Sequence, residues 1–306
     1  MTDKFRVGLI INDIFVNKQI YDLIKLSQKS TLYEITHLIL EKNNKSNQIN
    51  SYGEKILKTG FKKFINNLCF IILFKVELFL AKKKYSQFKD FFSLFNISNF
   101  KIEILSVNPI SSGNNSHYEY SQEDIEKIKS LRLNLLIKSS SGSIKGKVFN
   151  TTKNGIISFD YTNNNIKKFN SAGFWEVFNK EKKTGFSILR LTDKLHEEIV
   201  LFKGYFPTSI FYSLNLLSLY KKSNPFLHKI IEKLIKEPKS IDANQKKIIS
   251  NQINKIPNIY SQVFYIFLLI KNILKKIITK KYKWSVAYKF VKDWKDTSKL
   301  SELIKI

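Results

Sequence analysis

The chain has 306 residues, 43% of them hydrophobic, which is enough to bury a large core in one large domain or two small ones. Its formal net charge is +27, but only three of its 52 basic residues are arginines, the type that bidentate recognition of phosphates and bases favours. We therefore expect a lysine-rich solvated surface and no specific nucleic-acid partner, although such a surface also suits peripheral contact with an anionic membrane. The single cysteine, Cys69, excludes an internal disulfide and the first residues show no signal-peptide pattern, so we expect a cytoplasmic protein, free or peripheral at the inner membrane surface.

The N-terminal segment has the pattern of the first half of a doubly wound sheet. Phe5 to Ile11 is an almost continuous apolar run, which predicts a central parallel strand. A helix is predicted from Asn17 to Lys29 and a second strand from Glu34 to Leu40. No Gly-x-Gly-x-x-Gly follows the first strand, so an NAD-type pyrophosphate site is not expected.

A helical insertion is predicted from Tyr52 to Phe95. Leu68 to Phe74 is almost wholly apolar, and lysines flank it at 62, 63, 75, 82, 83 and 84. Such a helix either packs on the sheet or on the C-terminal helices, or lies on a membrane surface with its lysines at the lipid phosphates. We favour packing.

A loop of small residues follows the fourth predicted strand. Strands are predicted from Ile102 to Val107 and from Leu133 to Ile137, and Ser121 to Asp124 has the pattern of a capping box that opens a helix from Ile125 to Leu131. The loop from Ser139 to Gly146 lies at the carboxyl end of its strand, where open α/β sheets bind ligands. It is either an ordinary turn or a place where backbone N–H groups approach a ligand, and the candidate binding residues are Ser141, Gly142, Ser143 and Ile144.

Three further strands are predicted between Gly155 and Thr208. The first, Gly155 to Phe159, is followed by a polar loop and by a helix from Ser171 to Lys180, with Ser171 as its N-cap. The second runs from Phe186 to Leu191 and the third from Ile199 to Phe202.

This stretch resembles the core of the folate-dependent formyltransferase family, whose members include methionyl-tRNA, glycinamide-ribonucleotide and sugar-amine formyltransferases. The family has a strand ending in Asn-x-His, a loop, a helix, a Gly-Val-Thr-Ile strand and an Asp-x-Gly turn. The matching segments are Gly155-Ile-Ile-Ser-Phe-Asp160, Ala172-Gly-Phe-Trp-Glu-Val177, Thr184-Gly-Phe-Ser-Ile188 and Leu195-His-Glu-Glu-Ile-Val-Leu201. The residues of the second segment, together with Phe206-Pro-Thr208, look most similar to a branch of the family that is often fused to a carbohydrate-related domain. The resemblance implies a Rossmann-like α/β fold with a mostly parallel sheet.

The resemblance also implies a reaction and a set of site residues. Members of the family transfer a formyl group from 10-formyltetrahydrofolate to an amine, here the amine of a sugar or related small molecule. The family's catalytic Asn, His and Asp match Ser158, Asp160 and His196, and the donor would be bordered by the loop residues named above and by Glu197. Since the His and Asp are exchanged, we expect Asp160 and His196 to face each other.

Two functions remain open from the sequence. A carboxylate cannot stabilise the oxyanion that formyl transfer creates, so we expect ordinary catalysis to be lost or altered. The alternative is a non-catalytic binding or scaffold module of the same fold. We expect the segments 139–146, 158–163 and 195–198 to converge at one edge of the sheet. No His or Cys pair has metal-ligand spacing, so no metal is expected.

After an α/β domain of residues 1–208, a helical region is predicted from 209 to 306. Its helices are expected at 210–220, 225–235, 242–253 and 258–281, separated at Pro225, Pro238 and Pro257. We expect the last helix to leave part of its apolar face uncovered or to cover it with the insertion helix. Trp284 to Tyr288 looks like the start of a further domain, so we expect a truncated or split form of a longer protein.

Overall fold

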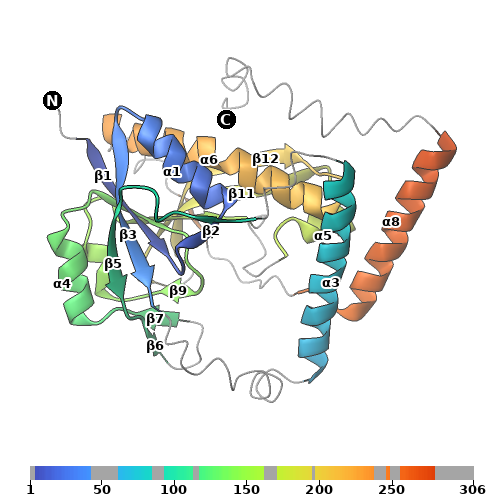
Figure 1. The fold of residues 1–306 in the computed structure, drawn as a ribbon, viewed down its shortest axis with the longest axis horizontal. Coiled ribbons are helices and arrows are strands. Elements are labelled where there is room, and N and C mark those ends of the chain that lie inside the picture. Colours follow the sequence, from blue (N-terminus) through green and yellow to red (C-terminus); the bar gives the residue numbers. More distant parts are fainter. Residues whose placement is uncertain are drawn as a thin grey trace.

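The structure, a computed structural model, describes residues 4–42, 61–84, 93–112, 117–161, 171–194, 197–237, 246–248 and 256–279. Its centre is an eight-stranded sheet with the strand order β13-β12-β11-β10-β8-β1-β3-β5 (Figure 1). In chain order these strands are β1 (Phe5–Ile11), β3 (Tyr33–Glu41), β5 (Glu103–Val107), β8 (Leu135–Lys138), β10 (Ile156–Asp160), β11 (Lys183–Leu191), β12 (Glu198–Pro207) and β13 (Lys246–Ile248).

The five strands of the sheet that come first along the chain are parallel, and the three that come last form its antiparallel side. Strands β10, β8, β1, β3 and β5 pair in parallel, whereas β11, β12 and β13 are each antiparallel to the preceding strand in the sheet. The chain therefore has the predicted Rossmann-like α/β fold with a mostly parallel sheet. Two small sheets lie beside it, formed by β2 (Phe15–Asn17) with β4 (Leu94–Asn96), and by β6 (Ile110–Ser112), β7 (His117–Glu119) and β9 (Ser143–Ile144).

Helices cover both faces of the sheet because the central strands are apolar on both sides. On β1, Val7, Leu9 and Ile11 join a core that includes buried side chains of α1 (Lys18–Lys29) and α6 (Tyr212–Lys236). Ile10 points the other way, into a second core with α4 (Gln122–Ser130) and the 3-10 turn η3 (Lys147–Asn150). This alternation follows from the period-2 geometry of a strand.

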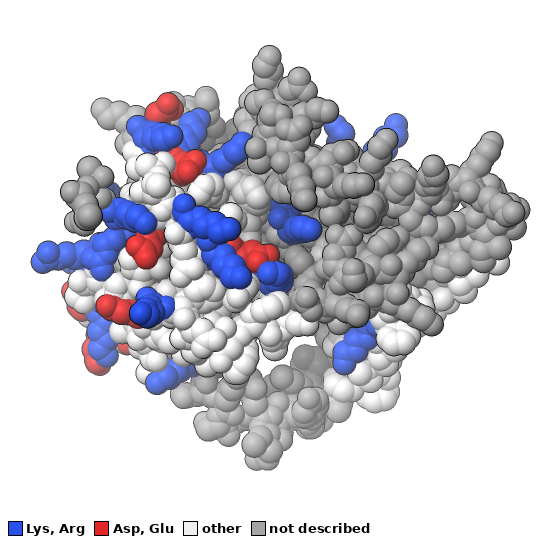
Figure 2. Space-filling view, turned by 45° about the horizontal axis from the view of Figure 1, so that its top comes forward, with Lys and Arg blue, Asp and Glu red and all other residues white. Residues whose placement is uncertain are grey.

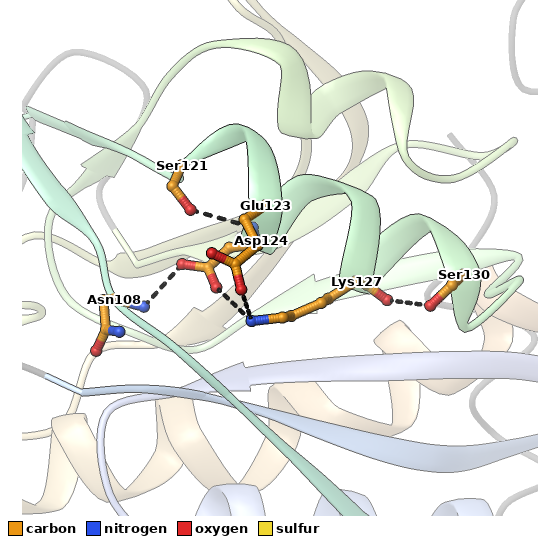
Figure 3. A network of polar contacts seen from close by, with 6 residues as sticks. All are labelled: Asn108, Ser121, Glu123, Asp124, Lys127 and Ser130. Atoms are coloured by element: carbon orange, nitrogen blue, oxygen red, sulfur yellow. Dashed lines mark hydrogen bonds and ion pairs between the residues drawn. The ribbon is translucent and has the colours of Figure 1, made fainter.

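The predicted cap of α4 is present, with one change of partner (Figure 3). The Ser121 hydroxyl accepts a hydrogen bond from the Asp124 backbone N–H at 3.1 Å. The Asp124 carboxylate does not complete a reciprocal capping box; it accepts the Asn108 N–H at 3.0 Å instead. Since Asn108 directly follows β5, this bond ties the end of that strand to the start of α4, and Lys127 adds an ion pair to Glu123 at 2.5 Å.

Four predicted helices differ from those observed. Pro225 does not separate two helices but lies inside α6, because Leu219 and Phe226 on either side of it both pack on the core of the sheet. The helix expected from 242 to 253 contains strand β13 in its described part, which pairs with β12. The helix expected from Ser171 is shorter, α5 (Phe174–Phe178), because Ser171 belongs to the turn before it and accepts the Phe174 N–H through its carbonyl.

The insertion and the C-terminal region pack against each other. Helices α3 (Phe61–Lys84) and α8 (Ile259–Thr279) stand side by side at one end of the molecule (Figure 1) and share a third core with α5 and the start of α6. The sequence left two alternatives open, an uncovered apolar face on the last helix or its coverage by the insertion helix; α8 contacts α3 and also keeps exposed apolar side chains. Within the described ranges, no helix is both long enough and apolar enough to cross a bilayer. The segment from Trp284 lies outside the described residues.

A buried carboxylate holds this helical cluster together. Glu77 of α3 is 5% exposed. One of its oxygens accepts the backbone N–H and the hydroxyl of Ser213, at 3.0 and 2.9 Å, and the other accepts the Tyr265 hydroxyl of α8 at 3.1 Å. Phe211, at the N-cap position of α6, has no side-chain oxygen, so Glu77 caps α6 from another helix. Burial raises the pKa of Glu77 above its usual range.

Candidate functional site

Polar side chains gather where the parallel strands end. Asn12 directly follows β1, and Glu41, Lys138 and Asp160 are the last residues of β3, β8 and β10. Because these strands are parallel neighbours, their carboxyl ends lie along one edge of the sheet, the edge where open α/β folds bind ligands. The candidate site is built on this edge.

Lys138 shapes the 139–146 loop from inside. Its side chain is 5% exposed, and its ammonium donates to the backbone carbonyls of Ser140, Ser141 and Gly142 at 2.7, 3.4 and 2.9 Å. In a trans peptide the N–H points away from the C=O of the same unit. With the carbonyls turned toward Lys138, the N–H groups of Ser141, Gly142 and Ser143 point away from it, and that of Ser141 is taken up by Asn12.

A second set of bonds holds the outer side of the loop. The side-chain oxygen of Asn12 accepts the Ser141 N–H at 2.8 Å and the Ser141 hydroxyl at 3.2 Å. The Asn12 amide in turn donates to Glu41 at 3.0 Å, and the Tyr120 hydroxyl donates to the other Glu41 oxygen at 2.6 Å. Glu41 is 1% exposed, so these two hydrogen bonds replace the hydrogen bonds to water that its carboxylate loses on burial.

Two tyrosines complete the support. The Tyr118 and Ser140 hydroxyls are hydrogen-bonded at 3.1 Å, and the Lys138 ammonium lies 5.6 Å from the centre of the Tyr118 ring. Burial, and after it the negative charge of Glu41, raise the pKa of Tyr118 and of Tyr120, so both hydroxyls keep their protons. The loop is thus held in one shape by uncharged donors and a buried cation.

Most of this framework was not predicted from the sequence. No role was expected there for Asn12, Glu41, Lys138, Tyr118 or Tyr120. The first three carry a usable signal, since each is a polar residue that ends or directly follows an apolar run predicted to be a parallel strand. The two tyrosines carry none, because β7 is a three-residue strand whose pairing with β9 is visible only in three dimensions.

The four candidate binding residues of the loop have different surroundings. Ser141 uses both its N–H and its hydroxyl on Asn12. Gly142 has φ +80°, and a Cβ there would lie 2.9 Å from the Tyr118 ring, so a side chain is excluded. Ser143 and Ile144 form β9, and the Ile144 side chain is 4% exposed in the core beside α4. From Ile144, a ligand could meet the backbone but not the buried side chain.

Ser158 and Asp160 lie on β10 at the same edge. Being two residues apart on a strand, they project from the same face. The Ser158 hydroxyl donates to the Lys138 carbonyl at 3.1 Å, which joins β10 to the start of the loop. Asp160 is half-buried and pairs across the strands with Ser187. The structure therefore brings the segment from Ser158 together with the 139–146 loop.

The turn before the third predicted segment meets the end of the loop, since Asp193 accepts the Gly146 N–H at 2.7 Å, but the segment leads away from Asp160. Strand β11 is antiparallel to β10, with Asp160 opposite Ser187 and Ile156 opposite Leu191, so β11 leads away from Asp160. Glu198 begins β12 beyond that far end, next to the Ile199–Arg190 pair, and Glu197 immediately precedes it. The expected convergence of 195–198 with Asp160 at one edge is therefore wrong for Glu197 and Glu198. His196 lies outside the described residues, so its pairing with Asp160 stays a prediction.

Comparison with known proteins adds a likeness of fold. No family model matches the chain, and no curated protein matches its sequence. Similar solved structures are formyltransferases and deformylases. Glycinamide ribonucleotide transformylase 1 from Symbiobacterium toebii is 10% identical with a TM-score of 0.47, over 77% of this chain and 90% of that one. The sugar 3N-formyl transferase WlaRD is 12% identical with a TM-score of 0.39, over 82% and 68%.

A third similar structure is a formyltetrahydrofolate deformylase from Pseudomonas syringae, 7% identical with a TM-score of 0.46, over 77% of this chain and 63% of that one. These structures come from the group that the sequence resemblance names. At such identities and TM-scores the likeness concerns the general arrangement of the fold and carries nothing about substrate or activity. The chemistry of the site has to come from its own residues.

The loop fits the kind of group that the resemblance implies. A folate-type donor offers ring nitrogens, carbonyls and carboxylates, which are hydrogen-bond acceptors. The 139–146 loop turns backbone N–H groups away from Lys138, while the Tyr118 ring fills the space that a side chain at position 142 would need. Donors on the loop and acceptors on the ligand are complementary.

Proposed function

We propose that the carboxyl edge of the sheet binds a folate-type formyl donor, 10-formyltetrahydrofolate, together with the amine of a sugar or related small molecule, and transfers the formyl group slowly. The observation that carries the proposal is the 139–146 loop, anchored by Lys138 and Asn12 next to Ser158 and Asp160. A strand-to-helix turn without a ligand needs no buried lysine to orient its carbonyls. The resemblance of 155–208 to formyltransferases names the chemistry.

The donor would supply an activated formyl group, and the chain would supply a base and positioning. Asp160 would accept the proton that the amine releases as its bond to the formyl carbon forms, and would pass it to N10 of tetrahydrofolate as the bond between N10 and the formyl carbon breaks. Ser158 would have to turn its hydroxyl away from the Lys138 carbonyl before it could donate to the formyl oxygen. Asp160, as a carboxylate, opposes the negative charge that grows there. We therefore expect a rate about 100-fold or more below that of a site with a dedicated donor, the usual loss when one oxyanion donor is removed.

The second candidate is a binding module without transfer. It is favoured by the same two facts: the Ser158 hydroxyl is engaged with the backbone, and the Asp160 carboxylate is unsuited to an oxyanion. The two functions share the ligand and differ in turnover. Binding and transfer must therefore be measured separately.

The test uses the full chain and 5-formyltetrahydrofolate as a stable probe in titration calorimetry. We expect binding that weakens at least tenfold in Asn12→Ala, because the loop loses its outer anchor and with it part of its preorganisation. Asn134→Ala is the matched control, since Asn134 also accepts a backbone N–H (Arg6, 2.8 Å) but precedes β8, at the opposite end of the parallel strands. If titration calorimetry shows no heat of binding at about millimolar ligand, both proposed functions are refuted.

Transfer is then followed with 10-formyltetrahydrofolate and a panel of amino-sugars. Under the first function, slow turnover is expected in the parent and loss of turnover with retained binding in Asp160→Asn. Binding without turnover in the parent would favour the module. Turnover that survives Asp160→Asn would remove Asp160 from the proposed role. The variant Ser158→Asn with Asp160→His and His196→Asp restores the family residues, and activity gained only there would mark a retired enzyme.

A further inference from the structure

Helices α3 and α8 expose an unusual amount of apolar side chain. Among the described residues twenty-one large hydrophobic side chains are exposed, of which α3 carries seven and α8 eight. They include Phe79 at 68%, Tyr260 at 81% and Phe267 at 59% exposed. The seven on α3 are Phe61, Leu68, Ile71, Ile72, Val76, Phe79 and Leu80; the eight on α8 are Ile259, Tyr260, Val263, Phe264, Ile266, Phe267, Ile270 and Leu274.

These side chains form a stripe on each helix. On α8 the positions 260, 263, 267, 270 and 274 recur every three or four residues, which places them on one face. The opposite faces are buried together: Phe70 and Leu73 of α3 and Tyr265 of α8 belong to the same core cluster. Both stripes therefore point away from that core, at the end of the molecule where the two helices stand side by side (Figure 1). We call this the α3–α8 surface.

The charge on the two helices is of one sign. Helix α3 contains six lysines, and its one acidic residue is Glu77, which is buried against α6. Helix α8 contains three lysines and no acidic residue. Lys75 and Lys271 are exposed beside the apolar stripes. On the face shown in Figure 2, by contrast, basic side chains are spread over the described surface with acidic ones among them.

We propose that the α3–α8 surface binds the interface of an anionic lipid bilayer. Apolar side chains would enter the boundary between headgroups and acyl chains, and the lysines would meet lipid phosphates. Charge complementarity selects this occupant over a second copy of the chain, because a self-complementary contact would bring lysines against lysines. Neither helix needs to span the membrane for this mode of binding.

The experiment is co-sedimentation of the full chain with vesicles of phosphatidylcholine, with and without phosphatidylglycerol. We expect binding to the anionic vesicles that falls at high salt, since salt screens the lysine–phosphate attraction. Lys75→Gln with Lys271→Gln should weaken partitioning about 30-fold, because each lysine near an anionic surface contributes about 1 kcal/mol. Val263→Ser with Phe267→Ser should weaken it at least tenfold by removing buried apolar area.

The matched control is Phe15→Ser with Leu94→Ser, which removes two side chains 50% and 68% exposed on the β2–β4 sheet. It should bind vesicles as the parent does. Failure of the parent to co-sediment at low salt would overturn the proposal, as would equal losses in the control. Light scattering without vesicles tests whether the surface binds a second copy of the chain instead. A parent that is a dimer, with a monomeric Val263→Ser, Phe267→Ser variant, would assign the surface to a second copy and overturn the lipid proposal.

Discussion

Replacing Glu77 by alanine should weaken the helical cluster severely. The carboxylate accepts three hydrogen bonds, two from Ser213 and one from Tyr265. Its loss strands the buried Ser213 N–H, whose bond to Glu77 is the cap of α6, and the buried Tyr265 hydroxyl, at about 1 to 3 kcal/mol each. Release of the buried charge offsets part of this. We expect the free energy of unfolding to fall by about 2 to 4 kcal/mol, measured by urea denaturation with circular dichroism.

The substitution Glu77→Gln separates charge from shape. The amide side chain would keep an oxygen for the Ser213 N–H, so this change should cost about 1 kcal/mol, the scale of one hydrogen bond. Burial raises the folded-state pKa of Glu77 above 4.5, so ionisation costs stability at every pH above that folded pKa. The cost disappears as the pH falls through the folded pKa toward 4.5. The parent should therefore gain stability relative to Glu77→Gln on acidification, by at most about 1.4 kcal/mol per pH unit.

The exposed Glu34 at the start of β3 gives a control, because Glu34→Gln should change the free energy of unfolding by less than about 0.5 kcal/mol. A loss below about 0.5 kcal/mol in Glu77→Ala would show that the carboxylate does not cap α6 in solution. A parent that loses stability relative to Glu77→Gln on acidification would refute the argument from burial.

Two further substitutions test the core. Gly204→Ala places a Cβ 2.1 Å from the Phe186 ring, so we expect a loss of about 1 to 3 kcal/mol in the free energy of unfolding. Adding Phe186→Leu should recover part of this loss, and full additivity of the two substitutions would argue against the contact. Asn215→Ala leaves the Gly173 carbonyl and the Ser209 N–H without their present partners, at 2.8 and 3.0 Å, and should cost about 3 kcal/mol in urea denaturation, whereas a near-neutral result would mean that water replaces the amide.

Local patterns were enough to predict the parallel half of the fold. The apolar run from Phe5 to Ile11 is β1 without a shift of either end, and Ser121 caps α4 as its spacing indicates. Local patterns failed where distant contacts decide. Proline costs a helix interior about 3 kcal/mol, yet α6 continues through Pro225 because burial of Leu219 and Phe226 on the sheet outweighs that loss. Strand β13 exists because β12 offers it an edge.

The site was predictable only in part for a similar reason. The loop after β8 was found because a strand end followed by small residues is a local signal. The position of Glu197 and Glu198 depends on the direction of β11, and a family motif gives the order of segments but not the register of their pairing. The role of Lys138 depends on three carbonyls that follow it, and nothing in a lysine at a strand end distinguishes this arrangement from a solvated side chain.

The bond between Glu77 and Tyr265 joins residues 188 positions apart. At a synthesis rate of about 5 to 20 residues per second, α3 leaves the ribosome roughly 10 to 40 s before the tyrosine that completes its pocket. During that interval both its apolar stripe and its buried face lack their final partners. The nascent chain thus passes through a long window in which chaperones have a clear target, and synonymous codons that slow translation between α3 and α8 should lower the yield of folded protein.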